Sequence, residues 1–242
     1  MRIVAALVLA SALVACDPGA GEDACGVANR DLSMVATVVD NGADIHAEVD
    51  FSRVDAEIDL PLALCDTDEL KIAGRHADRI DRADRVVYAI TVANDSSRTV
   101  GFELARTDET TLHFEIELPP AFAISAPLPG DEVSRSADFM LGWDPPLPGT
   151  QIHISLAEEI GYGVCLETMV AEHDYKNENG VAVDDDGGWQ IPASVIDGGT
   201  RDKCDATYRL TRFSSPGYPA ELHAGGVVEG RVERTVAFIS VP

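Results

Sequence analysis

Short runs in which apolar and polar residues alternate dominate the chain beyond its first two dozen positions. The clearest is 43–51, whose two sets are Ile45, Ala47, Val49 and Phe51 against His46, Glu48 and Asp50. A period of two is that of a β-strand with one buried and one solvated face. Asn41-Gly42 separates this run from Ser33–Asp40. The arrangement predicts a hairpin with strands Ser33–Asp40 and Ala43–Phe51, closed by a type I′ turn with positive φ at both turn residues.

Similar segments continue as far as a proline pair at 119–120. They are rich in β-branched or aromatic residues and bounded by Asp, Asn, Gly or Pro, which predicts further strands. These are Ala56–Cys65, Glu69–Ala73, Arg85–Ala93, Thr99–Arg106 and Thr111–Leu118. The charged segment His76–Ala83 fits either a brief helix or a loop. Because consecutive prolines interrupt backbone pairing, we place a domain boundary near residue 120.

The second block repeats the strand signals up to the C-terminal end of the sequence. Its predicted strands are Asp138–Trp143, Gln151–Ala157, Gly163–Ala171, Trp189–Ile191, Thr207–Phe213 and Gly225–Val241. Strands of this length and spacing are typical of sandwiches and barrels. The sequence therefore predicts an all-β chain with two β-sandwich domains, residues 25–120 and 121–242.

Part of the second block is similar to a known family. Phe139-Met-Leu-Gly-Trp143-Asp-Pro-Pro146, then Gly149 and Ile152-His-Ile-Ser-Leu156, resembles the second and third strands of a fibronectin type III or related immunoglobulin-like domain. Tyr208-Arg-Leu210-Thr-Arg212 followed by Pro216-Gly217 resembles the sixth strand and its turn. The resemblance covers residues 122–242 and implies that Trp143 fills the space between two sheets. Two cysteines and a long acidic insertion depart from the family pattern.

The first sixteen residues carry a sorting pattern. Arg2 precedes the apolar run Ile3–Ala15, whose 13 residues fall short of a membrane span and fit the apolar region of a signal peptide. Leu13-Val14-Ala15-Cys16 resembles the lipobox of a bacterial lipoprotein. The resemblance implies a signal peptide of residues 1–15 and lipidation of Cys16 by acyl chains such as palmitate. An ordinary secretory signal is the alternative.

We therefore expect a lipid-anchored protein of the bacterial cell envelope that faces the periplasm or the exterior. In some Gram-negative bacteria Asp17 would resemble an inner-membrane retention signal, so both the outer and the inner membrane stay open. Residues 16–24 are predicted to be the lipidated cysteine and a flexible tether, with a reach of at most about 25 Å. The folded body would then stay close to the bilayer.

The mature chain is strongly acidic. Loss of Arg2 leaves 17 basic and 42 acidic residues. Such a surface repels nucleic acid and anionic lipid headgroups, so we expect no nucleic-acid partner. It favours divalent cations or a basic partner instead.

Four cysteines remain besides Cys16, and an even number in an exported chain indicates two disulfides. Three pairings are open. We favour Cys25–Cys65 and Cys165–Cys204, because each pair then lies within one predicted domain, at separations of 40 and 39 residues. A zinc site is disfavoured, since no Cys-x-x-Cys pair exists and the compartment is oxidising.

No local catalytic motif stands out. The sequence contains no Gly-x-Ser-x-Gly, Ser-x-x-Lys or His-Glu-x-x-His, and no glycine-rich phosphate loop. The six histidines are scattered, and His46, His113 and His153 fall on the expected solvated faces of strands. We therefore expect no enzyme and no cofactor, with weak calcium binding as the one reservation.

That reservation concerns Glu172–Gly188, which holds six carboxylates in 17 residues. Calcium prefers hard oxygen ligands on turns that glycine permits, so Asp184, Asp185 and Asp186 are candidate calcium ligands. An EF-hand register fails because two ligand positions fall on alanines. A solvated acidic loop is the alternative.

The expected function is a binding or structural role at a membrane surface, with an envelope protein or a glycan as partner. Loops at the ends of a sandwich commonly carry recognition, which favours Glu172–Gly188 and Ser214–Leu222. In the second loop Tyr218 stands between prolines and could contact a partner or pack as part of a turn. The alternatives are a carbohydrate-binding accessory lipoprotein, which needs coplanar exposed aromatics, and an envelope enzyme on a sandwich scaffold.

Overall fold

The computed structural model describes residues 22–55, 58–107, 109–158, 180–193, 195 and 202–242. These residues form strands and a single 3-10 turn, and the strands include every predicted one that lies among them, with ends shifted by up to four residues. The elements are β1 Glu22–Asp23, η1 Asn29–Asp31, β2 Leu32–Asp40, β3 Asp44–Asp55, β4 Ile58–Ala63, β5 Glu69–Ile72, β6 Arg75–His76, β7 Asp78–Asp81, β8 Val86–Ala93, β9 Thr99–Ala105, β10 Leu112–Glu117, β11 Ala123–Ala126, β12 Glu132–Ser134, β13 Phe139–Asp144, β14 Gln151–Glu158, β15 Val181–Asp184, β16 Gly188–Ile191, β17 Cys204–Ser214 and β18 Val227–Val241. The predicted strand Gly163–Ala171 lies outside the described residues.

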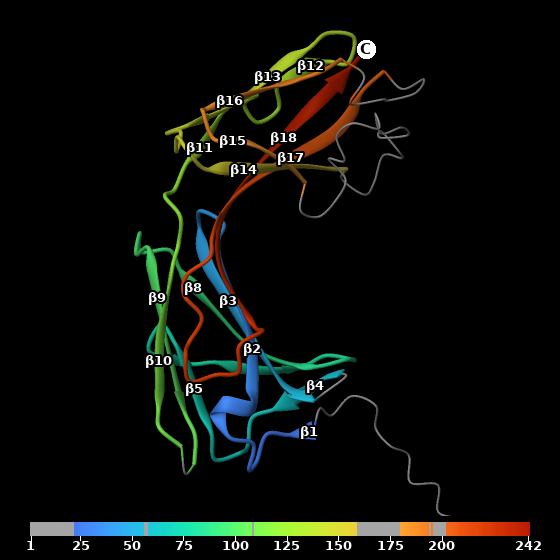
Figure 1. Cartoon of the computed structure of the whole chain (residues 1–242). Coiled ribbons are helices and arrows are strands. Elements are labelled where there is room, and N and C mark those ends of the chain that lie inside the picture. Colours follow the sequence, from blue (N-terminus) through green and yellow to red (C-terminus); the bar gives the residue numbers. More distant parts are fainter. Residues whose placement is uncertain (1–21, 56–57, 108, 159–179, 194, 196–201) are drawn as a thin grey trace, which may run out of the picture.

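One eleven-stranded sheet runs through both halves of the molecule (Figure 1). Its main path is β1-β4-β3-β2-β18-β17-β14-β15, with β8 beside β3, β7 beside β8 and β12 beside β18. A four-stranded sheet, β10-β9-β5-β6, packs on it in the first half, and a three-stranded sheet, β11-β13-β16, packs on it in the second. The chain is therefore all-β, as predicted.

The C-terminal strand β18 joins the two halves. Its first six residues pair in parallel with Val35–Asp40 of β2, and Gly230–Ser240 pair antiparallel with β17. Side chains at even positions of β18 are buried along both halves, including Val228, Val232 and Phe238. Because alternate residues of a strand point to opposite faces, both smaller sheets cover the same face of the long sheet. We call the other face of the long sheet the open face.

The strand pairing does not follow a division of the chain at residue 120. The segment 215–226, which we call the strap, returns to the first half before β18 begins. The Tyr218 hydroxyl accepts a hydrogen bond from the Met34 N–H at 2.8 Å, and the His223 N–H donates to the Leu32 carbonyl at 2.9 Å. A Cβ on Gly226 would lie 2.0 Å from the Met34 carbonyl oxygen, so this close approach requires glycine. The first half is completed by the C-terminal part of the chain.

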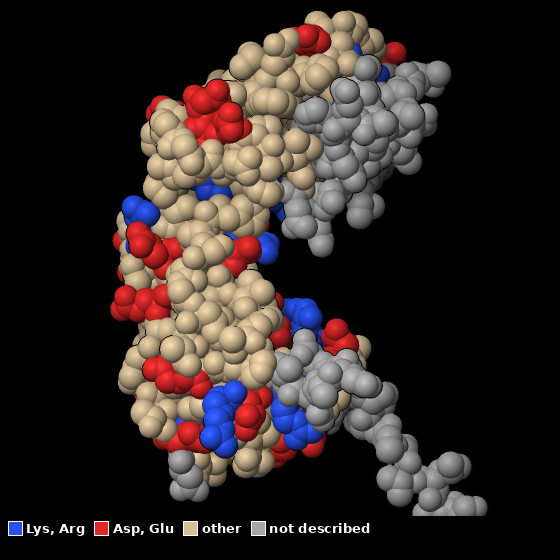
Figure 2. Space-filling model, viewed as in Figure 1, with Lys and Arg blue, Asp and Glu red and all other residues tan. Residues whose placement is uncertain are grey.

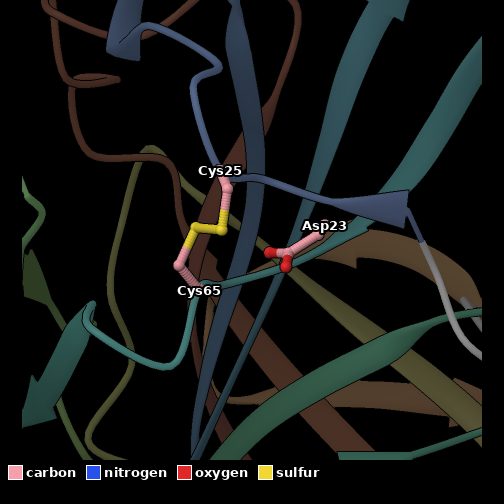
Figure 3. A group of neighbouring side chains, drawn as sticks. All are labelled: Asp23, Cys25 and Cys65. Carbon is pink, nitrogen blue, oxygen red and sulfur yellow. A yellow bond between two sulfur atoms is a disulfide. The ribbon is translucent and has the colours of Figure 1, made fainter.

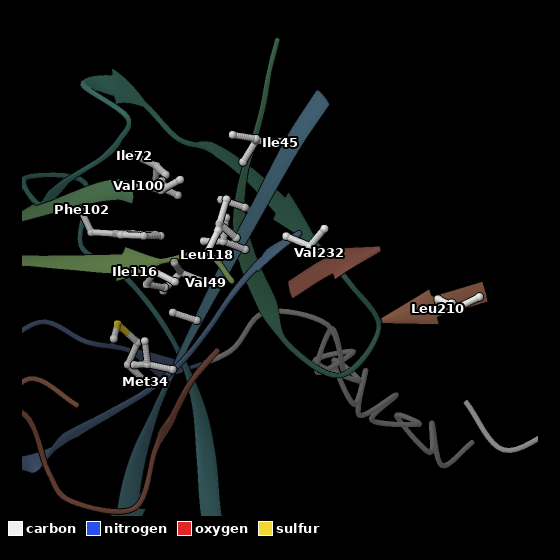
Figure 4. Packing of buried hydrophobic residues seen from close by; sticks show 14 of the residues in the cluster. Met34, Ile45, Val49, Ile72, Val100, Phe102, Ile116, Leu118, Leu210 and Val232 are labelled. Carbon is white, nitrogen blue, oxygen red and sulfur yellow. The ribbon is translucent and has the colours of Figure 1, made fainter. Parts of the chain in front are cut away.

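Apolar residues from facing sheets form the core. In the first half Met34 and Val49 of the long sheet lie toward Phe102 and Ile116 of the four-stranded sheet (Figure 4). In the second half Trp143 is 2% exposed, so the prediction that it fills the space between two sheets is confirmed.

The first hairpin forms, but not with the predicted turn. Asp40 pairs with Ile45, so four residues connect the arms, and Gly42 has a φ of 100°. Asn41 is not among the described residues with positive φ. Its side-chain oxygen instead accepts hydrogen bonds from the N–H groups of Ala43 and Asp44 at 3.0 and 2.9 Å. The type I′ prediction was wrong because this side-chain bond stabilises a longer turn.

Most of the charged segment His76–Ala83 is strand, where a brief helix or a loop was predicted. Asp78–Asp81 forms β7, which pairs antiparallel with Val86–Ala89 of β8. Its four residues are all exposed, so no apolar periodicity marked it in the sequence. Pairing with a neighbouring strand decided the conformation.

Residues 22–24, which precede the predicted start of the first domain, belong to the folded body. β1 pairs in parallel with β4, and Ala24 is fully buried. The predicted disulfide Cys25–Cys65 is present, with Cα atoms 5.4 Å apart (Figure 3). Asp23 lies beside it, but two sulfur atoms bonded to each other are not thiolate ligands, so this group is a covalent bridge rather than a metal site. Residues 22–24 were predicted as part of the tether and are therefore a correction to it, whereas residues 16–21 lie outside the described residues.

Candidate functional site

A buried ion pair fixes the second half to the junction between the halves. Arg212 of β17 donates to both carboxylate oxygens of Asp185, from Nε at 2.6 Å and from Nη2 at 2.9 Å. The Trp143 indole N–H and the Leu147 N–H also donate to Asp185 Oδ1, at 2.7 and 3.2 Å. Arg212 further donates to the Pro120 carbonyl at 3.0 Å. Both charged side chains are at most 1% exposed.

This geometry corrects the calcium prediction at Asp185. The carboxylate is buried and accepts four hydrogen bonds, two of them from the guanidinium group of Arg212, so its charge is already paired and closed off from solvent. Asp184 and Asp186 are exposed on either side of it. Calcium binding by these two residues stays an untested prediction. The predicted recognition loop Glu172–Gly188 lies in part outside the described ranges, so its role stays a prediction as well.

A second arginine ties the junction to the first half. Arg234 of β18 donates to the carbonyl of Asp40 at 2.9 Å and to its Oδ1 at 3.2 Å. Both arginines also contact the Phe122 ring, with guanidinium carbons 4.6 Å from its centroid for Arg212 and 5.9 Å for Arg234. Together with the continuous ladder of β18, these contacts hold the two halves in one orientation.

The open face carries an apolar row across five adjacent strands. Direct cross-strand pairing places its members in one line: Ile80 of β7, Val87 of β8, Asp50 of β3, Val35 of β2 and Val227 of β18. Ile80, Val35 and Val227 are 41%, 40% and 52% exposed, and the described residues contain only two other large apolar side chains as exposed as these. Val87, between Ile80 and Asp50, is only 1% exposed, so the exposed apolar members of the row are Ile80, Val35 and Val227. Such a patch marks a candidate interaction surface.

Asp50 is the single charge in the row and stands at its centre. Burial raises the pKa of Asp50 above its ordinary value, although the charge of Arg85 opposes the shift. The Arg85 guanidinium is 4.0 Å from the carboxylate, which is a loose pair. A carboxylate in this position would gain from a further cationic donor.

The neighbouring carboxylates on the open face are already paired. Glu48 lies 2.6 Å from Arg82, while Glu229 pairs with Arg231. Burial alone would raise the pKa of Glu48, but hydrogen bonds and charge from His46 and Arg82 outweigh it and lower the pKa. Asp50 is thus distinguished from its neighbours by the length of its ion pair.

The outer face of the four-stranded sheet carries a second polar cluster. Lys71 lies between Glu69 and Glu103 at 3.3 Å from each, and His76 lies 3.1 Å from Glu69. Figure 2 shows this mixture of both charges over the lower half of the molecule. Because its charges pair with one another, we place the candidate site on the open face instead.

The predicted site residues are distributed over several surfaces. His46 is on the open face beside Glu48, whereas His113 lies on the four-stranded sheet, 3.9 Å from Glu103. The ring of His153 stands edge-on to Phe213, with centroids 4.6 Å apart. Among the described residues, the large apolar side chains that are exposed include no aromatic ring. The described surface therefore lacks the set of coplanar exposed aromatic rings that a carbohydrate-binding role requires.

Tyr218 is half-buried and packed. Burial raises its pKa, although the hydrogen bond that its hydroxyl accepts from the Met34 N–H opposes this shift. The structure therefore gives this residue the role of a turn contact between the strap and β2, which was the alternative to a partner contact.

Replacement of Tyr218 by phenylalanine should lower the free energy of unfolding by about 1–2 kcal/mol, because the Met34 N–H loses its acceptor. Urea denaturation gives the loss, and amide hydrogen exchange at Met34 should become faster. Unchanged exchange at Met34 would show that the hydroxyl is dispensable for the strap. The Tyr218→Leu variant, which also removes ring packing, should lose more.

Two predicted site residues fall outside the described residues. Cys16 and Cys165 are not described, whereas Cys204 is buried at the start of β17. Lipidation of Cys16 and the pairing Cys165–Cys204 stay predictions. Within the described part of the chain, no helix is long and apolar enough to cross a bilayer.

Sequence reasoning did not find the apolar row. Alternation showed which side chains of each strand share a face, but Ile80 and Val227 lie 147 residues apart in the chain. Only strand order brings them into one line. The exposed isoleucine within a charged segment was the sole local signal.

Neither a protein-family model nor a curated protein matches the chain. Among solved structures, the I9–I11 tandem from titin is 8% identical with a TM-score of 0.25, and the match covers 87% of this chain and 66% of that one. The fibronectin(III)-like modules of Clostridium thermocellum CbhA are 8% identical with a TM-score of 0.22, and the match covers 86% of this chain and 94% of that one. The chain thus spans just under two thirds of the titin tandem. Overlays with such TM-scores carry no argument, and the all-β architecture rests on its own strand pairing.

Proposed function

We propose that this chain is a lipoprotein of the bacterial cell envelope, anchored to a membrane through Cys16, which binds a partner with the open face of its long sheet. Its two halves are then immunoglobulin-like or fibronectin III-like sandwiches that share one sheet. The apolar row on an otherwise strongly charged molecule is the observation that carries the binding role. The role requires no catalysis.

The positions of β1 and of the C-terminal end of β18 support a role in which the open face is held away from the bilayer. β1 lies at one end of the elongated molecule, and the C-terminal end of β18 lies at the other (Figure 1). A lipid on Cys16 would hold the β1 end near the membrane. The rigid junction would then keep the second half at a set distance, and the open face would stand between the two ends.

Replacing Cys16 by serine tests the anchor. We expect the wild-type chain to take up labelled palmitate and to pellet with membranes, and the Cys16→Ser variant to do neither. Acyl chains contribute about 0.8 kcal/mol for each buried methylene, so loss of the lipid should release most of the protein. The measurement is fractionation of a bacterial host that processes lipoproteins.

The matched control is Ser11→Ala, which changes a small residue in the same predicted signal without touching the cysteine. It should label and pellet like the wild type. A wild-type chain that is exported, unlabelled and soluble would refute the anchor and favour the ordinary secretory signal. That outcome would leave the binding role of the open face to be judged separately.

A further inference from the structure

The apolar row on the open face has dimensions that select a shape of partner. Neighbouring strands are about 4.8 Å apart, so the five members span about 19 Å, with Asp50 about 10 Å from either end. Val35 stands one strand from Asp50, and Val227 stands two strands away. A partner must therefore offer an apolar group, a group suited to a carboxylate, and two more apolar groups at these intervals.

An α-helix offers side chains at these intervals. Residues at i and i+7 on one face are about 10.5 Å apart along the axis, and i+3 or i+4 lies about 5 Å from i. An extended segment places side chains of one face about 6.8 Å apart, which does not match the central spacing of the row. The row runs across the strands, so a helix lying on it would cross them.

The central Asp50 decides the charge of this partner. Covering the row would remove the remaining water from a carboxylate whose nearest cation, Arg85, is 4.0 Å away. Burying a charge is costly unless it gains a partner, so the covering surface must bring a donor cation. A helix with a lysine or arginine in its apolar stripe meets this requirement.

A second copy of this chain does not fit. A two-fold axis through the middle of the row would place one Asp50 against the other, which is unfavourable in a site that excludes water. The net charge of −24 would add repulsion between the copies.

On these grounds we propose that the open face binds an amphipathic helix of a partner protein. Its apolar side chains lie on Ile80, Val35 and Val227, and one lysine or arginine within its apolar stripe pairs with Asp50. This inference rests on the proposed binding role of the open face and names the chemistry of its partner.

The test uses the full chain and three synthetic helical peptides of about 18 residues, which is long enough to present four interfacial positions over about 19 Å. They are identical except that the central stripe position is lysine, norleucine or glutamate. In calorimetric titrations the lysine peptide should bind at least tenfold more tightly than the norleucine peptide, and the glutamate peptide should not bind. An Asp50→Asn variant should remove the preference for lysine while retaining the norleucine peptide.

Variants of the row separate this site from general attraction to an acidic surface. Val35→Asp should abolish binding of the norleucine peptide, whereas Met140→Asp, on the three-stranded sheet at 55% exposure, should leave both affinities unchanged. Circular dichroism of each variant verifies folding. Asp50→Asn should fold like the wild type, because burial disfavours the charge that it removes.

Each adverse result has a distinct meaning. Equal affinity for lysine and norleucine peptides would overturn the assignment of a cation while leaving the open face as a binding surface. An equal loss in Met140→Asp and Val35→Asp, or no binding by any peptide at millimolar concentration, would overturn the helix site. Neither result would affect the test of the anchor, since that test reads lipidation alone.

Discussion

Replacing Arg212 by methionine is expected to lower the free energy of unfolding by about 3–5 kcal/mol. The change leaves the Asp185 carboxylate buried without its cation, and only the Trp143 and Leu147 N–H groups remain as donors. It also removes the contact with the Phe122 ring at the junction between the halves. Urea denaturation followed by tryptophan fluorescence measures the loss, since Trp143 itself reports on the site.

The control lies three residues earlier on the same strand. Arg209 is 45% exposed and 3.9 Å from Glu233, and Arg209→Met should cost less than about 1 kcal/mol, because exposed ion pairs contribute little. The double variant Arg212→Met with Asp185→Leu should recover much of the stability, since it leaves no unpaired buried charge. If Arg212→Met and Arg209→Met lowered the free energy of unfolding equally, the buried Arg212–Asp185 pair would not stabilise the fold more than an exposed pair does.

Removing the disulfide with Cys25→Ala and Cys65→Ala together should lower the free energy of unfolding by roughly 4 kcal/mol in the chain-entropy model, given a loop of about 40 residues. The bridge constrains the unfolded chain across β2, β3 and β4. The double variant is preferable to a reducing agent, which would also attack any bond of Cys204. Differential scanning calorimetry or urea denaturation gives the change.

This variant should be less stable but should keep its fold. Arg106 still donates to the carbonyls of Val27 and Ala24 at 2.8 and 2.9 Å, and it pairs with Asp68. These contacts hold the N-terminal segment against the first half without the bridge. A double variant as stable as the wild type would show that this arginine, rather than the disulfide, secures the start of the fold. Adding Arg106→Met would then separate the two contributions.

Most of the strands could be predicted because each is set by local alternation. Ile45, Val49 and Phe51 are buried and His46 is not, as the pattern of that run indicates. Several of the short strands, among them β7 and β15, were missed, because a segment of four residues or fewer holds few positions that could show a period. The predicted disulfide Cys25–Cys65 is present, because both cysteines belong to one sandwich.

Long-range placement could not be predicted in the same way. β18 was recognised as a strand, but nothing in Val227–Val241 indicates that one half of it completes the first sandwich. Asp185 stood in a run of acidic residues typical of a solvated loop, yet it is buried against Arg212, 27 residues away. The pattern of a strand specifies which side chains share a face, and says little about which strand lies beside it.

The sequence by itself determined the all-β class and the faces of the long strands, because both follow from local period. It favoured the Cys25–Cys65 bridge among three open pairings, and a family resemblance implied the burial of Trp143. The tertiary structure alone decided that one sheet joins the two halves and that Ile80, Asp50, Val35 and Val227 stand in one row. The physical reason is the order of strands. Residues far apart in the chain become neighbours only when backbone pairing between distant strands satisfies their hydrogen bonds.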